Sequence, residues 1–338
     1  MKIIVDGMGG DNAPLEIIKG CIEASKLIGH EIYIIGNEEE INSHLRTFKY
    51  EKEKIKVIHA SEVINNDEAP VKAVRTKLDS SMVKGINLVK DGFGDLFISA
   101  GNTGAIMAGG LFILGRIQGI DRPAIAATYP ILGKGVSLLV DTGANSECKP
   151  NNLLEFGTMG SIYMEKVLGI KNPTVGLVNI GEEETKGSTL VKGAYELLKK
   201  SNVNFIGNVE AREIPKGAAD VIVCDGFVGN VIIKLSEGLA WTILKLIKTK
   251  FTQGPVAKMG ALLLSGPLQD LKKEFDYSEY GGAPILGVKG AIIKIHGSSN
   301  ANAVKNAILK GIPYVENQVV QIIQNSVLEL EEITTSEL

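Results

Sequence analysis

Five short segments of the chain share a pattern that is suited to binding an anion. In each segment an apolar run ends at glycine, asparagine or aspartate, and a helical pattern follows. A loop of this kind presents backbone N–H groups at the N-terminus of a helix, where the helix dipole also favours negative charge. The segments span residues 3–14, 96–105, 138–145, 176–187 and 219–235. We therefore expect a phosphate or an oxyanion to bind among these loops.

The segment 219–235 shows the change of pattern most clearly. Residues 221–224 form a continuous apolar run, which is typical of a strand buried on both faces, and apolar residues resume at helical spacing after residue 230. Between them lie Asp225, Gly226, Gly229 and Asn230. The pattern predicts a strand, a tight loop and a helix. For any single loop the alternative is a plain turn with Asp225 or Asn230 as helix cap, but the repetition along the chain favours a binding site.

Two other groups of polar residues could take part in chemistry. The acidic run 182–184 suits the start of a helix, where negative charge is favourable, whereas Lys186 in the same turn would oppose the dipole unless it holds an anion. His296 and Ser298 have the types of a base and a nucleophile. The run 298–300 equally suits the capping of a final helix over 301–325, and we favour that interpretation.

The elements that must position these residues alternate along the chain. The first third predicts strands near 2–6, 31–36 and 55–60 with helices over 13–28 and 38–46, a pattern typical of an α/β fold with a parallel sheet. Loops at the carboxyl ends of parallel strands converge on one edge, where ligands bind. We expect a single domain over 1–330, interrupted at 236–275 by a protruding helical hairpin, and a frayed acidic tail over 331–338.

Composition and missing motifs exclude several classes of function. The net charge of −3 argues against binding to nucleic acid. The three cysteines and four histidines lack metal-ligand spacing, so no structural metal and no disulfide framework are predicted. The N-terminus enters a strand directly, which predicts a cytoplasmic protein without a signal peptide. The dinucleotide pattern G-x-G-x-x-G is broken at Asn12, and neither a P-loop nor a G-x-S-x-G elbow occurs.

The ordered set of motifs resembles one family over nearly the whole chain. The motifs are IVDGMGGDNAP, VRTKLDSSM, SAGNTGA, VDTGAN, GEEETKG, DGFVGN and HGSSN. The set is similar to the PlsX phosphate acyltransferases of bacterial phospholipid synthesis. The resemblance implies reversible transfer of a fatty acyl group from acyl carrier protein to inorganic phosphate, giving an acyl phosphate, with no cofactor. It also implies a homodimer, a downstream glycerol-3-phosphate acyltransferase, and a three-layer α/β/α fold like that of phosphotransacetylases and isocitrate or isopropylmalate dehydrogenases.

This chemistry needs no protein nucleophile. Phosphate is already an anionic nucleophile, so the enzyme must mainly position it and stabilise the oxyanion, for which one preorganised donor contributes about 3 kcal/mol. We assign Lys186 to neutralising the phosphate and the transition state, and Asn230 to orienting phosphate or donating to the carbonyl oxygen. The other predicted substrate-binding residues are Asp6, Gly9, Gly10, Asn102, Thr103, Gly104, Asp141, Asn145, Asp225, Gly229, His296 and Ser298.

Three alternative functions remain open on the sequence alone. A phosphotransacetylase that uses coenzyme A is the nearest alternative, and spacing does not exclude it. An NAD-dependent dehydrogenase of the related fold would need the missing cofactor pattern. A non-catalytic scaffold of lipid-synthesis enzymes is the third.

The predicted hairpin carries more apolar surface than one chain can bury. Around Trp241, apolar residues recur at helical spacing and predict a subunit interface about a two-fold axis. Leu262, Leu263 and Leu264 are consecutive, so they cannot all face one core. We expect them to contact the partner subunit, an acyl chain or the membrane surface. Lys245, Lys248, Lys250 and Lys258 are available for anionic headgroups or the acidic carrier protein.

Overall fold

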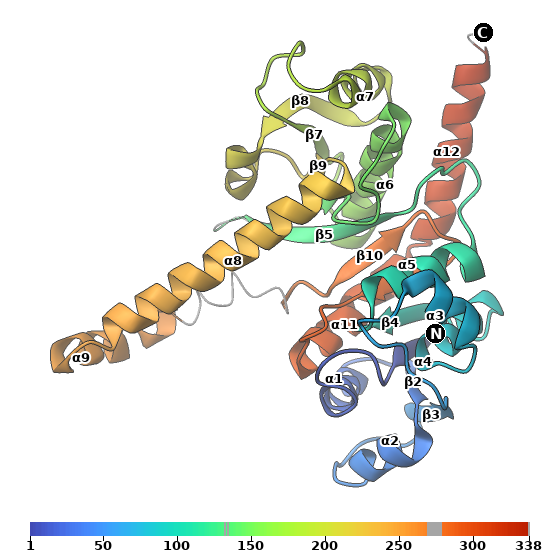
Figure 1. Ribbon diagram of the computed structural model, residues 1–338, viewed down its shortest axis with the longest axis vertical. Coiled ribbons are helices and arrows are strands. Elements are labelled where there is room, and N and C mark those ends of the chain that lie inside the picture. Colours follow the sequence, from blue (N-terminus) through green and yellow to red (C-terminus); the bar gives the residue numbers. More distant parts are fainter. Residues whose placement is uncertain (132, 134, 269–278, 337–338) are drawn as a thin grey trace.

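The described part of the chain is built around one large mixed sheet. The computed structural model describes residues 1–131, 133, 135–268 and 279–336 (Figure 1). The sheet has eleven strands in the order β3-β2-β1-β4-β11-β10-β5-β6-β9-β7-β8. The strands are β1 (Lys2–Asp6), β2 (Glu31–Gly36), β3 (Ile55–His59), β4 (Leu96–Ser99), β5 (Ala124–Ile131), β6 (Gly135–Val140), β7 (Thr174–Asn179), β8 (Asn204–Glu210), β9 (Val221–Val223), β10 (Ala283–Leu286) and β11 (Ala291–Lys294).

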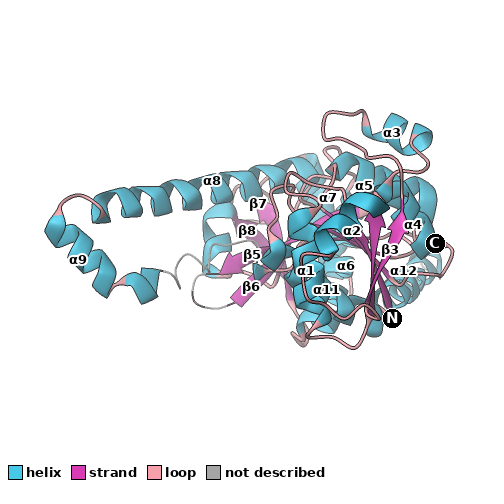
Figure 2. Cartoon of the chain, turned by 90° about the horizontal axis from the view of Figure 1, so that it is seen from below, coloured by secondary structure: helices cyan, strands magenta, loops and turns pink. Residues whose placement is uncertain are grey.

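Helices cover both faces of this sheet. They are α1 (Leu15–Ser25), α2 (Glu38–Leu45), α3 (Pro70–Thr76), α4 (Ser81–Lys90), α5 (Thr103–Gly109), α6 (Pro150–Leu168), α7 (Thr189–Lys200), α8 (Gly226–Phe251), α9 (Pro255–Leu263), α11 (Ala301–Glu316) and α12 (Val319–Ser336). A π-helical turn, Gly110–Leu114, extends α5, and a 3₁₀ helix, Ala211–Lys216, precedes β9. Figures 1 and 2 show this body with α8 and α9 projecting from it.

Strand periodicity explains the three layers. Along β1, Ile3 and Val5 belong to the core that contains α1, α6 and α11, whereas Ile4 belongs to the core that contains α4 and α5. Successive side chains of a strand point to opposite faces, so both faces of an apolar strand need helical cover. The predicted α/β/α architecture is therefore confirmed, with strand and helix bounds in the first third close to those expected.

The sheet departs from expectation in strand direction. The strands β3, β2, β1, β4 and β11 are mutually parallel, as are β6, β9, β7 and β8, but β5 pairs antiparallel with both β10 and β6, and β10 pairs antiparallel with β11. The two parallel blocks consequently run in opposite directions. The sequence predicted a mostly parallel sheet, which is confirmed, with the five loops on one of its edges. The loops instead follow strands of two opposed parallel blocks. Strand alternation carries no information on this reversal, because it depends on tertiary pairing.

Two helix boundaries also differ from the prediction. The helix α8 begins at Gly226 with Asp225 as its cap, so Gly229 and Asn230 lie within its first turns rather than in a loop. A Cβ atom on Gly229 would collide with the carbonyl oxygen of Asp141, so this glycine allows close packing. The predicted final helix is two helices, α11 and α12, separated where Gln318 adopts a left-handed φ of 52°. The tail expected to fray begins inside α12, and residues 337–338 lie outside the described residues.

The predicted helical hairpin is present as α8 followed by α9. Figure 2 shows the two helices forming an arm that extends away from the sheet. With 26 residues, α8 is about 39 Å long. By length and composition alone it could cross a membrane, and only 6% of its apolar window is buried. Its first turns, however, pack on β6 in the body. The part of the predicted hairpin over 269–275 lies outside the described residues.

Candidate active site

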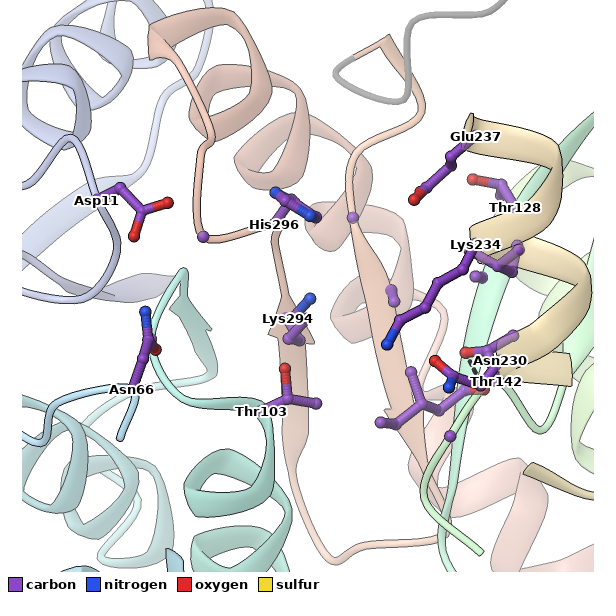
Figure 3. A pocket seen from close by; sticks show the side chains of 18 residues that line it. Asp11, Asn66, Thr103, Thr128, Thr142, Asn230, Lys234, Glu237, Lys294 and His296 are labelled. Atoms are coloured by element: carbon purple, nitrogen blue, oxygen red, sulfur yellow. Dashed lines mark hydrogen bonds between the residues drawn. The ribbon is translucent and has the colours of Figure 1, made fainter. Parts of the chain in front are cut away.

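A cavity of about 650 Å³ opens where the two blocks of the sheet meet. Loops that follow β1, β4, β6 and β11 reach it, and so does the first part of α8. Figure 3 shows polar side chains from both halves pointing into the same space. The polar side chains that line it belong to Asp11, Asn66, Thr103, Thr128, Thr142, Asn230, Lys234, Glu237, Lys294 and His296. Three of the predicted site residues, Thr103, Asn230 and His296, are therefore brought together here.

Two lysines supply positive charge to the cavity, and sequence reasoning had missed both. Lys234 lies one turn after Asn230 on α8, so the two side chains share a helix face (Figure 3). Lys294 is the last residue of β11. Burial lowers the pKa of Lys294, Glu237 raises it, and Lys234 lowers it further. An anion placed between two lysines would replace water lost on burial and relieve their repulsion.

The sequence contained a usable signal for each lysine. Lys234 stands at the i+4 position from Asn230, which was already a candidate. Lys294 is a charged residue at the end of the apolar run Ala291–Lys294. A lysine at the carboxyl end of a buried strand reaches the edge where ligands bind.

The ring of His296 is held by the loop that follows β11. The backbone N–H of Ser298 donates to Nδ1 at 3.1 Å, and the Ser298 hydroxyl lies 2.8 Å from the same atom. Burial, followed by the charge of Lys294, lowers the pKa of His296. Because an amide can only donate, Nδ1 accepts and the neutral ring carries its proton on Nε2. Of the run 298–300 that was expected to cap the final helix, Asn300 caps α11 by accepting from the N–H of Ala303 at 3.0 Å, whereas Ser298 bonds to His296 instead.

Two predicted site residues, Asp6 and Asp141, are buried and organise loops. The Asp6 carboxylate accepts from the N–H groups of Met8 at 3.2 Å and Gly9 at 3.1 Å, and from the Ser99 hydroxyl at 2.7 Å. Burial raises its pKa, against the effect of these bonds. Neither carboxylate lines the cavity.

The Asp141 carboxylate organises the loop after β6 by accepting hydrogen bonds from its backbone. It accepts from the backbone N–H groups of Ile125 and Ala144, both at 3.1 Å, and of Asn145 at 2.7 Å. The Asn145 side chain donates to Asp141 at 3.0 Å and to the Pro123 carbonyl at 2.8 Å. Burial raises the pKa of Asp141 as well. Asp141 and Asn145 thus hold the loop that places Thr142 and Gly143 at the cavity.

Glycines let the loop after β1 approach its neighbours. A Cβ atom on Gly9 would lie 2.8 Å from the backbone nitrogen of Gly101. Gly10 has a φ of +101°, which favours glycine, and a Cβ there would lie 2.9 Å from the Gly297 carbonyl oxygen. The N–H of Asp11 donates to that carbonyl at 2.8 Å. Gly9 and Gly10 therefore bring the loops after β1, β4 and β11 together.

The loop after β4 contributes one lining side chain, that of Thr103. Asn102 caps α5 by accepting from the N–H of Ala105 at 3.0 Å, and its side-chain N–H₂ donates to three carbonyls of the 65–68 segment. Gly104 packs against Pro70. At the other side of the cavity, Asp225 accepts from the N–H of Val228 at 2.9 Å and caps α8.

Lys186 belongs to a different loop from these residues. It is exposed in the loop between β7 and α7, and it does not line the cavity. The helix α7 begins at Thr189 with Ser188 as its cap, so Lys186 precedes the first turn of the helix. We had expected Lys186 to lie within that turn. Asn179 holds this loop by donating to the Lys186 carbonyl at 3.1 Å. The assignment of Lys186 to phosphate stays a prediction.

The fold of the chain is similar to that of phosphotransacetylases of known structure. A phosphotransacetylase from Streptococcus pyogenes superposes with a TM-score of 0.64 at 17% identity, over 95% of this chain and 94% of that one. The 4-hydroxythreonine-4-phosphate dehydrogenase of Klebsiella pneumoniae superposes with a TM-score of 0.52 at 12% identity, over 92% and 98% of the two chains. At these identities the likeness establishes a shared fold.

Sequence similarity establishes the family. The family model described as "Fatty acid synthesis protein" matches residues 1–322. The phosphate acyltransferase of Alkaliphilus oremlandii is 57% identical over 98% of both chains, and that of Clostridioides difficile is 49% identical over 98% of both. The chain therefore belongs to the phosphate acyltransferase family of fatty acid synthesis, and it is an acyltransferase enzyme.

Proposed function

We propose that the enzyme transfers a fatty acyl group from acyl carrier protein to inorganic phosphate and releases an acyl phosphate for phospholipid synthesis. The observation that supports this most directly is the cavity that Asn230 and Lys234 line from α8 and Lys294 lines from β11 (Figure 3). Two cations and an amide donor suit a doubly charged phosphate and a developing carbonyl oxyanion.

The proposed reaction balances without a protein nucleophile. An oxygen of hydrogen phosphate attacks the thioester carbonyl carbon, the carbonyl oxygen becomes an oxyanion, and the C–S bond then breaks. The sulfur leaves with the electron pair and takes up the proton that phosphate gives up, so the products are an acyl phosphate and a thiol. A thiol with a pKa of about 8.5 is a good leaving group. The neutral His296 can donate a hydrogen bond without changing the net charge.

The experiment that tests this proposal compares donors. The enzyme is incubated with phosphate and either an acyl carrier protein thioester or the matching coenzyme A thioester, and free thiol and acyl phosphate are measured. We expect phosphate-dependent thiol release with the carrier protein thioester. Release only from the coenzyme A thioester would indicate phosphotransacetylase activity, and release from neither would overturn the proposal.

We further propose that the arm contacts a second subunit and the membrane surface from the cytoplasmic side. Along α8, Trp241 is 64% exposed within one chain, and Leu244, one turn further on, is half-buried. Such apolar surface on a projecting helix suits a two-fold interface. Leu262 and Leu263, at the end of α9, are 73% and 80% exposed and suit a bilayer interface. Delivery there would place the acyl phosphate near a downstream glycerol-3-phosphate acyltransferase.

A further inference from the structure

A second hollow adjoins the cavity along the base of the arm. It has a volume of about 280 Å³ and shares the lining residues Thr128, Ile233 and Glu237 with the cavity, so the two spaces adjoin. Apart from the shared positions, its wall is mainly apolar. The residues that give it this character are Tyr129, Pro130, Pro215, Leu239, Ala240 and Ile243.

This second space, which we call the groove, has a buried tyrosine on one side and exposed apolar side chains on the other. The hydroxyl of Tyr129 on β5 lies 2.9 Å from the hydroxyl of Ser236 on α8, and this bond joins the arm to the sheet. Tyr129 is 6% exposed. On the arm, Leu235, Leu239 and Ile243 are 68%, 57% and 46% exposed. Apolar surface of this kind gains free energy when an apolar ligand covers it.

We infer that this groove binds the acyl chain of the substrate, with the thioester carbonyl in the cavity and the methyl end toward Ile243. The inference rests on the proposed acyl transfer. A ligand that spans both spaces must be polar at one end and apolar along the rest, as a fatty acyl thioester is. A second copy of the protein could cover the exposed leucines, but it would not explain why the apolar groove adjoins the polar cavity.

The length of the groove should limit how much of the acyl chain contributes to binding. From Ile233 to Ile243 the helix rises about 15 Å. Each methylene group that enters the groove should raise the affinity about fourfold, until the chain passes Ile243. The side chain at position 243 then sets the length beyond which further methylenes add nothing.

The test fills the far end of the groove. We compare kcat/KM for butyryl, lauroyl and palmitoyl thioesters in the wild type, in Ile243→Trp, and in Leu246→Trp as matched control. Leu246 is exposed on the same helix but does not line the groove. Ile243→Trp should lower kcat/KM at least tenfold for the two long chains and leave butyryl unchanged. Leu246→Trp should change none of the three.

A binding assay separates this inference from the proposed reaction. Displacement of a fluorescent fatty acid by laurate measures binding to the groove without turnover. Ile243→Trp should weaken the binding of laurate about tenfold. Absence of phosphate-dependent turnover in the wild type would overturn the proposed function but would not change the result of the binding assay. The inference that the groove binds the acyl chain would be overturned if Ile243→Trp lowered kcat/KM equally for all three chain lengths or for none of them. It would also be overturned if Ile243→Trp dissociated a dimer without changing the dependence of kcat/KM on chain length.

Discussion

Lys294 is the residue at which ligand binding and stability oppose each other. Its pKa is lowered mainly by burial, so the folded protein bears a cost for keeping it charged. Below the lowered pKa that cost is fully present, and the free energy of unfolding rises with pH between the lowered value and the ordinary one of 10.5. Lys294→Met should therefore raise the melting temperature at neutral pH by roughly 1–3 °C, and the gain should shrink toward pH 10.

The same substitution should weaken phosphate binding. A hydrogen bond to a charged group contributes about 1.5–3 kcal/mol, so Lys294→Met and Lys234→Met should each raise the KM for phosphate about 10- to 150-fold. Lys289→Met is the matched control, because Lys289 is exposed and does not line the cavity. Steady-state kinetics at varied phosphate measures this. An unchanged KM in both cavity variants would show that phosphate binds elsewhere.

Substitution of Lys186 tests whether phosphate binds at this residue or at the cavity lysines. Its motif predicts that Lys186→Ala loses most turnover while the fold and the dimer stay intact, although the side chain is exposed outside the cavity. Turnover and sedimentation of Lys186→Ala, measured beside Lys192→Ala, decide the question. Wild-type turnover would remove Lys186 from the mechanism and leave phosphate to Lys234 and Lys294.

At the scale of elements, the start of α8 depends on a close contact. A Cβ on Gly229 would collide with the Asp141 carbonyl oxygen, whereas nothing lies within 4 Å of a Cβ on Gly238 of the same helix. Gly229→Ala should therefore cost about 1–3 kcal/mol of unfolding free energy and lower turnover, because the shift moves Asn230 and Lys234. Gly238→Ala should add about 0.5–1 kcal/mol. Urea unfolding compares the two, and equal effects would contradict the packing argument.

Element type was predictable wherever local signals were strong. The helix α6 follows its apolar period and ends at Gly169, which adopts a left-handed φ of 74°. The loop glycine pattern misled at α8, because Gly229 serves close packing, which no local rule distinguishes from a turn. The break at Gln318 was missed because glutamine carries no turn signal, although its backbone adopts a left-handed φ of 52°.

At the scale of the whole molecule, the site joins two halves that the sequence presents separately. The position of Asn230 was found from its motif, but its neighbour Lys294 comes from a strand that pairs with β4 in the other block. That juxtaposition depends on the reversal at β5 and β10. Motif reasoning could therefore name the loops but not assemble the cavity.

The end of the arm carries three consecutive exposed leucines, Leu262, Leu263 and Leu264, and this leads to the last prediction. Each leucine that enters a bilayer interface contributes roughly 1.5–3 kcal/mol, so two or three suffice for reversible attachment. Lys245, Lys248 and Lys250 on α8 add attraction to anionic headgroups. The double variant Leu262→Glu/Leu263→Glu should lose co-sedimentation with anionic vesicles at least tenfold while keeping soluble acyl transfer.

Two leucines of the body supply the control for that variant. Leu27 and Leu78 are 64% and 69% exposed, close to the 73% of Leu262, so Leu27→Glu/Leu78→Glu adds the same charge to equally exposed positions. This control should bind vesicles as the wild type does, because its leucines lie in turns of the body rather than on the arm. Sedimentation of both variants without vesicles reports the subunit state. If the arm variant dissociates, or stays with the vesicles, its leucines serve the subunit interface and the membrane contact is wrong.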